Sequence, residues 1–105
     1  MVSYLLLFLA GAALANAVPH FVAGVQGRKF PTPFAKPPGR GLSSSRVNAA
    51  WGVTNMALGY GFAIWAGGIN LGDWRQALAL GIGVLAMGLI LATRFGAVFS
   101  GPADS

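Results

Sequence analysis

The sequence has no cysteine, a single histidine and only two acidic residues, Asp73 and Asp104, among its 105 positions. Without cysteine the chain can form no disulfide, thiolate metal site or cysteine nucleophile. One carboxylate lies between two apolar segments and the other lies near the C-terminus. A single chain can therefore assemble neither paired catalytic carboxylates nor a Ser-His-Asp triad, and we predict that the protein is not an enzyme.

Charge of either sign is missing from three long segments. Charged residues make up 9% of the chain and hydrophobic residues 55%, and none of the charged ones occurs before Arg28, between Arg46 and Asp73, or between Arg75 and Arg94. Each gap is long enough for a membrane helix, which needs about 20 mainly apolar residues. We predict an all-α integral membrane protein with three transmembrane helices in one domain, residues 1–105. The expected spans are residues 2–25, 47–67 and 74–93.

The first span also has features of a cleaved signal peptide. Two overlapping small-x-small patterns, Ala13-Leu14-Ala15 and Ala15-Asn16-Ala17, match the usual cleavage site. However, no Lys or Arg precedes the apolar run, and cleavage would leave the basic segment that follows it outside the membrane, against the positive-inside rule. We favour an uncleaved span, with cleavage as the alternative.

The segment 26–46, QGRKFPTPFAKPPGRGLSSSR, is rich in proline and in positive charge. Its prolines exclude a helix and favour an extended, polyproline-like loop, and its serines can cap the helix that follows. The simplest interpretation is a solvated loop that sets topology; the alternative is contact with anionic lipid headgroups or a partner protein. The residues available for such contact are Arg28, Lys29, Lys36, Arg40 and Arg46.

Charge placement predicts an orientation. With the N-terminus outside and the C-terminus inside, Arg94 joins the five basic loop residues on the cytoplasmic side, and only Arg75 lies opposite. A bacterial plasma membrane fits best, and the net charge of +5 then needs no nucleic-acid partner. The short, Gly-rich connector 67–74 predicts that the second and third spans form an antiparallel hairpin, and residues 94–105 form a short tail.

Each span carries a stripe of small residues at helical spacing. Small residues let helices approach closely, so these stripes are expected to face other helices rather than lipid. The first two stripes also carry polar side chains, whereas the third has none. They contain Ala12, Asn16, His20, Ala23 and Gly27 on the first span, Asn48, Gly52, Asn55 and Gly59 on the second, and Ala77, Gly81, Gly88 and Ala92 on the third.

The polar members of these stripes predict an interhelical cluster of Asn16, His20, Asn48 and Asn55. His20 and Asn55 each lie about 12 Å from the nearest loop arginine at 1.5 Å per residue, so we expect a hydrogen bond between them. Such a cluster usually serves packing; the alternative is a proton relay, a quinone contact or a cofactor ligand. One histidine and no carboxylate within a span give a monomer no usual metal or haem ligand set, so no cofactor is expected.

These features predict a non-enzymatic accessory or assembly subunit of a membrane complex, or a homo-oligomer. Its expected partners are the lipid bilayer, anionic lipid headgroups and other membrane subunits or further copies of itself. One alternative is a small oligomeric channel or transporter whose path is lined by Asn16, His20 and Asn55. A second alternative is a quinone- or haem-associated redox subunit, in which two copies of His20 could meet.

Overall fold

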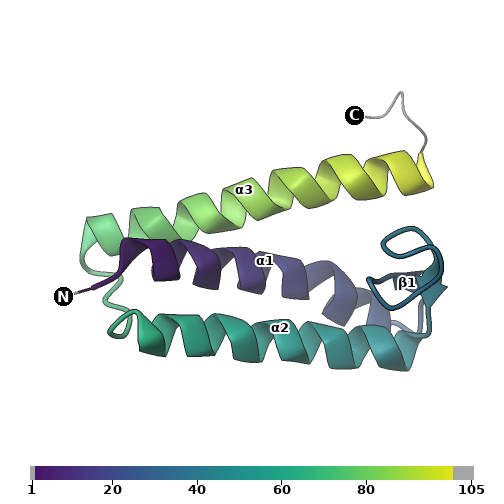
Figure 1. The fold of residues 1–105 in the computed structure, drawn as a ribbon, viewed down its shortest axis with the longest axis horizontal. Helices are drawn as coiled ribbons and strands as arrows, with labels where there is room; N and C mark the ends of the chain where they lie inside the picture. The colour runs from purple at the N-terminus through teal and green to yellow at the C-terminus, as the bar shows by residue number, and fades with distance from the viewer. Residues whose placement is uncertain (1, 101–105) are drawn as a thin grey trace.

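A computed structural model describes residues 2–100 of the chain (Figure 1). Three long helices dominate it, and a two-stranded antiparallel ladder lies in the loop between the first and second helices. The prediction of a mostly helical protein with three long helices is confirmed. The elements are α1 (Tyr4–Val25), β1 (Phe30–Pro31), β2 (Leu42–Ser43), α2 (Ser45–Trp65) and α3 (Trp74–Phe99).

Helix α1 lies at the centre of the bundle. It packs against both α2 and α3, which make at most marginal contact with each other (Figure 1). At one end the backbone N–H of Ser3 donates to the carbonyl of Ala66, 3.0 Å away, and so ties the start of α1 to the end of α2. The predicted hairpin of the second and third helices is therefore wrong as a packing unit, because α1 lies between them.

Helices α1 and α3 approach until their backbones touch. A Cβ atom added to Gly11 would collide with the carbonyl of Leu80, and one added to Gly83 would collide with the carbonyl of Phe8. Two glycines, one on each helix, thus allow this close packing.

The small stripe predicted on the third helix does not pack on another helix of this chain, and its contact with a partner protein stays a prediction. Its glycines, Gly81 and Gly88, have open space where a Cβ would stand, and Ala92 is exposed. The buried face of α3 instead carries Gln76 and Gly83. Helix α3 is apolar on nearly all sides and carries small residues on two of its faces. Its sequence therefore gives little indication of which face packs on α1.

Helix α2 presents its predicted stripe to α1. The buried residues of α2 are Asn48, Gly52, Asn55, Gly59 and Ala63. Three close approaches support this interface: Gly24 to the backbone of Ala49, Gly52 to Phe21, and Gly59 to Leu14 and Ala10.

Side chains and glycines define the helix ends. Ser3, Ser44 and Asp73 each cap a helix N-terminus by accepting a hydrogen bond from a backbone N–H, so the expected serine cap of the second helix is confirmed at Ser44. Helix α1 ends at Val25, and Gly27, just beyond the C-cap residue Gln26, has a φ of 72° in the left-handed region. The N–H of Arg28 donates to the carbonyl of Ala23 at 2.9 Å. This is a Schellman ending, which satisfies carbonyls that the helix leaves free.

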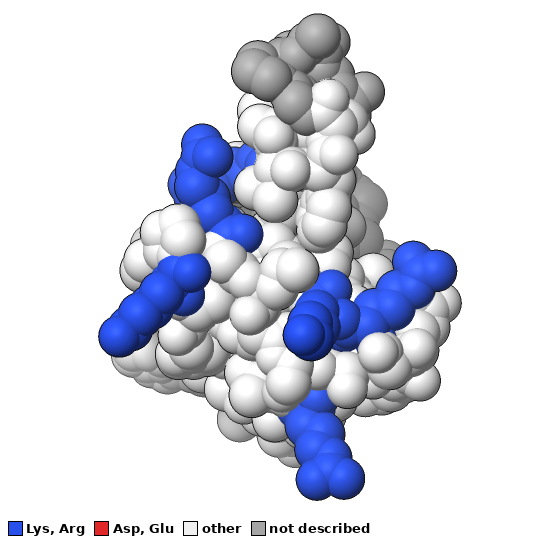
Figure 2. Space-filling model, turned by 90° about the vertical axis from the view of Figure 1, so that its right-hand side faces the viewer, with Lys and Arg blue, Asp and Glu red and all other residues white. Residues whose placement is uncertain are grey.

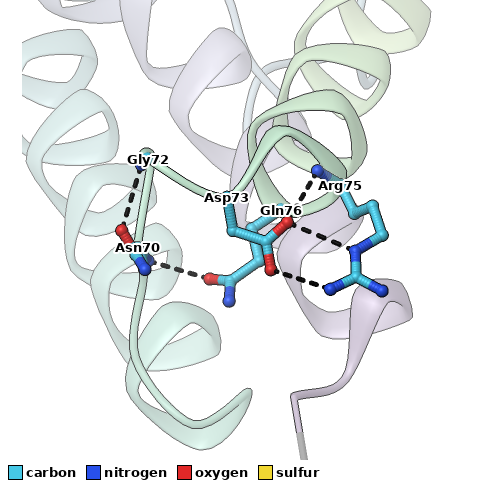
Figure 3. Close-up of polar contacts among 5 residues, drawn as sticks. All are labelled: Asn70, Gly72, Asp73, Arg75 and Gln76. Carbon is cyan, nitrogen blue, oxygen red and sulfur yellow. Dashed lines mark hydrogen bonds and ion pairs between the residues drawn. The ribbon is translucent and has the colours of Figure 1, made fainter.

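The connector between α2 and α3 is held by short-range polar contacts (Figure 3). Gln76 is buried, and its Oε1 accepts from the backbone N–H of Asn70 at 2.8 Å, while the side chain of Asn70 accepts from the N–H of Gly72 at 3.0 Å. Asp73 forms an ion pair with Arg75 at 3.3 Å. Hydrogen bonds from Arg75 hold the pKa of the Asp73 carboxyl below its ordinary value.

Two of the three helices are long and apolar enough to cross a membrane. They are α1, with 22 residues, and α3, with 26 residues; α2 has sufficient length, at 21 residues, but is less apolar. In length and composition α1 also resembles an N-terminal signal sequence, the alternative for this segment. The third helix is largely exposed, and its buried residues are Gln76 and Gly83. Three spans were predicted, and by this measure two helices qualify.

Helix α3 also continues past the predicted end of the third span. It runs through Arg94 to Phe99, so the first part of the predicted tail, residues 94–105, is helical. The remainder of that tail, residues 101–105, lies outside the described residues.

Candidate functional site

The predicted polar cluster forms two pairs between α1 and α2. Asn16 Nδ2 donates to Asn55 Oδ1 at 2.9 Å, and Asn55 Nδ2 in turn donates to the carbonyl of Trp51 at 2.8 Å. His20 Nδ1 lies 2.9 Å from Asn48 Oδ1. The structure thus brings all four residues into this interface, but as two separate pairs.

The predicted bond between His20 and Asn55 is wrong, because the loop arginines do not mark equal depths. Helix α1 ends at Val25, before Arg28, whereas α2 has already begun at Ser45. Counted from the helix ends, His20 lies about 8 Å deep, Asn48 about 5 Å and Asn55 about 15 Å at 1.5 Å per residue. His20 is therefore closer to the level of Asn48.

Asn48 is fully buried and connects His20 to the basic loop. Its Nδ2 faces the carbonyl oxygens of Phe30, at 3.0 Å, of Ser43, at 3.2 Å, and of Ser44, at 3.0 Å. With the amide nitrogen facing three acceptors, Oδ1 faces the imidazole, so we assign the proton to His20 Nδ1 as donor. His20 Nε2 then has no hydrogen-bond partner among the described residues.

Aromatic rings from three segments surround the imidazole. The rings of Phe30, Trp51 and Phe95 lie edge-on to His20, with centroids 5.5, 6.4 and 6.1 Å away. Phe30 also packs against Phe95 and Phe99 of α3, at 4.7 and 5.5 Å. The C-terminal turns of α3 thus pack on the loop and help to enclose His20.

The basic loop is compact rather than extended as predicted. β1 pairs with β2, with Phe30 opposite Ser43 and Pro31 opposite Leu42. Thr32 is buried at the centre of the fold-back: its hydroxyl bonds to the hydroxyl of Ser43, and its carbonyl accepts from the N–H of Gly39 at 2.9 Å. Prolines do restrict this segment, but buried Thr32 supplies the hydrogen bonds that turn it back on itself.

A cavity of about 320 Å³ that opens to the surface lies beneath this loop. Its lining includes Asn16 and His20 of α1 and Trp51 of α2, and residues of the loop cover it. The remaining lining residues are Leu91, Arg94 and Phe95 of α3 and, in the loop, Pro31, Thr32, Pro33, Pro38 and Gly39.

Trp51, whose ring lines this cavity, carries an unsatisfied polar atom. Its indole Nε1 is buried and has no hydrogen-bond partner among the described residues. The ring packs edge-on against Phe34, with centroids 4.9 Å apart. Trp51 thus forms part of the cavity wall.

Positive charge gathers at the same end of the bundle. Figure 2 looks onto this end, where Lys and Arg side chains spread over the surface and no described acidic side chain is in view. None of these basic residues makes an ion pair within residues 2–100, where the single recorded pair is that of Asp73 and Arg75. The predicted contact residues are all exposed: Arg28, Lys29, Lys36, Arg40 and Arg46.

Comparison with known proteins identifies no relative. No protein-family model, curated protein or solved structure matches the chain. Nor do three or more His, Cys, Asp or Glu side chains come together as a metal-ligand group within residues 2–100. Function must therefore be inferred from the chain's own residues.

Sequence reasoning missed three members of the cavity: Trp51, Arg94 and Phe95. Arg94 was counted only as a topology signal. One signal was available, since Arg94 and Phe95 follow the third apolar segment at the end where the basic loop was expected. Their meeting with Trp51 depends on how α3 rotates against α1, which the sequence does not encode locally.

Proposed function

We propose that the protein is a small integral membrane protein with a structural role, as an accessory or assembly subunit of a membrane complex or as a homo-oligomer. Its N-terminus lies outside and its basic loop and C-terminus in the cytoplasm. The main observation in support of this proposal is the pairing of Asn16 with Asn55 and of His20 with Asn48 between α1 and α2. Through these bonds the polar side chains hold α1 and α2 together, which is the usual role of such contacts in membranes.

The exposed surface of α3 supports a membrane environment. Leucines at 78, 85 and 89 are 52%, 61% and 61% exposed, and the helix would reach about 39 Å at 1.5 Å per residue. A water-soluble monomer rarely exposes such a continuous apolar surface. Lipid tails or helices of partner subunits would cover it.

The two ends of the bundle support the proposed orientation. Exposed Lys and Arg side chains gather at the loop end (Figure 2), as the positive-inside rule requires of a cytoplasmic face. At the opposite end Trp65 and Trp74 are 75% and 70% exposed, which suits an aromatic belt at the outer interface.

The central position of α1 supports an uncleaved first helix. Cleavage after Ala15 or Ala17 would remove Gly11 and with it the close contact to α3, and would also break or remove the Asn16–Asn55 pair. Intact-mass measurement of protein from membranes checks this directly. A full-length mass near 10.8 kDa is expected, and a mass lacking the first 15 to 17 residues would contradict it.

A transport path has less support. Two of its three proposed lining residues, Asn16 and Asn55, bond to each other, so a path along them would have to break that pair. A path would also need water-filled polar surface through the bundle, whereas the α1–α2 interface is closed by glycine contacts.

The test of the proposed role is extraction in gentle detergent followed by native mass spectrometry. A constant ratio of this chain to another membrane protein, or to further copies of itself, is the expected result. Recovery from the soluble fraction, or as a monomer alone from native membranes, would contradict the proposal. Proton or solute flux into vesicles that contain only this chain would favour the channel instead.

A further inference from the structure

The cavity beneath the basic loop has more hydrogen-bond donors than its described lining satisfies. The indole N–H of Trp51 is buried without an acceptor. Leaving a buried donor unpaired costs about 1–3 kcal/mol, and native structures rarely do so. Almost none of the surface of this nitrogen is accessible, so a bound molecule supplies the missing acceptor only when the indole ring turns toward the cavity.

Arg94 adds a positive charge to the same cavity. Its Nη2 would lie 3.2 Å from a Cβ placed on Gly39, so the guanidinium lies against the roof of the cavity. No described residue forms an ion pair with it. Arg94 and Trp51 come from different helices, so the guanidinium and an indole turned toward the cavity would offer donors to one occupant from two sides.

Size and wall chemistry restrict the occupant. A volume of about 320 Å³ falls within the range of small-molecule sites and far exceeds the roughly 30 Å³ that one water occupies. Prolines, Leu91 and Phe95 form apolar walls, and no carboxylate is among the lining residues. The cavity thus suits a compact organic molecule that carries negatively charged acceptor oxygens.

We propose that this cavity binds the phosphate group of an organic phosphate, which accepts hydrogen bonds from Arg94 and, once the indole ring has turned toward the cavity, from the N–H of Trp51. Phosphate suits this geometry because its oxygens accept from several directions and pair well with guanidinium. The organic part lies against Leu91, Phe95 and the prolines. The phosphate belongs either to an anionic phospholipid headgroup or to a soluble phosphate ester; only the lipid source rests on the proposed membrane role.

Fluorescence of Trp51 provides a direct test. In the double variant Trp65→Phe/Trp74→Phe, which changes two exposed residues at the opposite end, Trp51 is the sole tryptophan. Purified in a neutral detergent, this protein is titrated with phosphatidylglycerol, glycerol 3-phosphate and inorganic phosphate, with phosphatidylcholine and oleate as controls. A saturable change with a phosphate anion is expected. No change with any of them, or an equal response to oleate, would overturn the proposal.

The arms of this titration separate the two sources. A response to phosphatidylglycerol alone assigns the phosphate to a lipid headgroup, and an equal response to glycerol 3-phosphate assigns it to a soluble ester. Because the soluble arm needs no membrane, binding there would support the cavity chemistry even if the protein proved not to be a membrane subunit.

A matched pair of arginine variants separates a defined site from diffuse charge. Arg94→Gln is expected to weaken binding about tenfold or more, the size of losing one charge-assisted hydrogen bond. Arg40→Gln removes the same charge from an exposed loop position outside the cavity lining and is expected to weaken binding less than about twofold. Equal losses in both variants would overturn the site. Helix content and unfolding midpoint are measured for both, and Arg94→Lys, which keeps the charge without the planar fork, is expected to bind with intermediate strength.

Discussion

The side-chain amide of Asn48 joins His20 of α1 to the basic loop. Its oxygen lies 2.9 Å from His20 Nδ1, while its nitrogen faces carbonyls of the loop and of the start of α2. One buried side chain thus sets the orientation of the imidazole and the path of the loop together. The cavity beneath the loop depends on both.

Replacing Asn48 by alanine should destabilise the protein more than the same change at Asn55. Asn48→Ala leaves His20 and the carbonyls of Phe30 and Ser43 without their partner, and a loss of about 1–3 kcal/mol is expected. Asn55→Ala removes one interhelical bond, worth about 0.6 kcal/mol on average in a membrane protein. Unfolding by a denaturing detergent in mixed micelles measures both. A larger loss for Asn55→Ala would contradict the central role of Asn48.

Two glycines on α3 should respond in opposite ways to the same substitution. Gly83→Ala pushes a methyl group into the backbone of α1 at Phe8 and should destabilise the protein by about 1–3 kcal/mol, as overpacking does. Gly81→Ala meets open space and should be neutral or stabilising by up to about 1 kcal/mol, because alanine favours helix.

The unfolding midpoints of this pair test how α3 rotates against α1. Both changes add one methyl group to the same helix, so composition and hydrophobicity are matched. Destabilisation at Gly81 with tolerance at Gly83 would mean that the opposite face of α3 packs on α1.

The sequence was most informative where the physical signal is local. Uncharged segments indicate helices because charge is costly in an apolar setting, and the period of Asn48, Gly52, Asn55 and Gly59 marks a face that the structure buries. Ser44 caps α2 because a short hydroxyl side chain before a helix reaches its free N–H groups.

The features that the sequence did not predict depend on contacts between segments that are distant along the chain. The sequence did not predict which face of α3 packs on α1, because both of its small faces are bounded by apolar residues and only the contacts of Gly11 and Gly83 distinguish them. The loop was predicted to be extended because the buried bonds of Thr32 leave no local pattern. The cavity needs Trp51 and Arg94 to meet across two helices, and their spacing along the chain does not reveal this.

Acidification should weaken the start of α3 through Asp73. Because hydrogen bonds from Arg75 lower its pKa in the folded protein, the carboxylate stabilises the fold above its ordinary pKa of 3.8. This contribution is lost as the pH falls through the lower, folded value. Asp73→Asn retains a capping side chain but does not titrate there.

The Tm in detergent, compared at about pH 6 and about pH 3, should therefore fall more for the wild-type protein than for Asp73→Asn. The difference between the Tm changes of the two proteins reports on Asp73 alone, because the other carboxyl groups are present in both. An equal fall in both would show that the contact with Arg75 contributes nothing to stability in solution.

The proposed orientation can be tested with single cysteines, because the chain has none of its own. Thr32 lies near the middle of the basic loop but is buried and hydrogen-bonded, so a cysteine there would resist a reagent on either side of a membrane. Leu42 and Leu71 are better positions. They are 53% and 60% exposed, in the loop and in the connector at opposite ends of the bundle.

In intact cells a membrane-impermeant maleimide should label Leu71→Cys at once and Leu42→Cys only after permeabilisation, because the basic end faces the cytoplasm. The two variants carry the same substitution at similar exposure, so reactivity of the thiol does not distinguish them. The reverse pattern would invert the orientation and place the cavity beneath the loop on the outer side. Labelling of both in intact cells would show that the bundle does not span the membrane, since its two ends would then share one compartment.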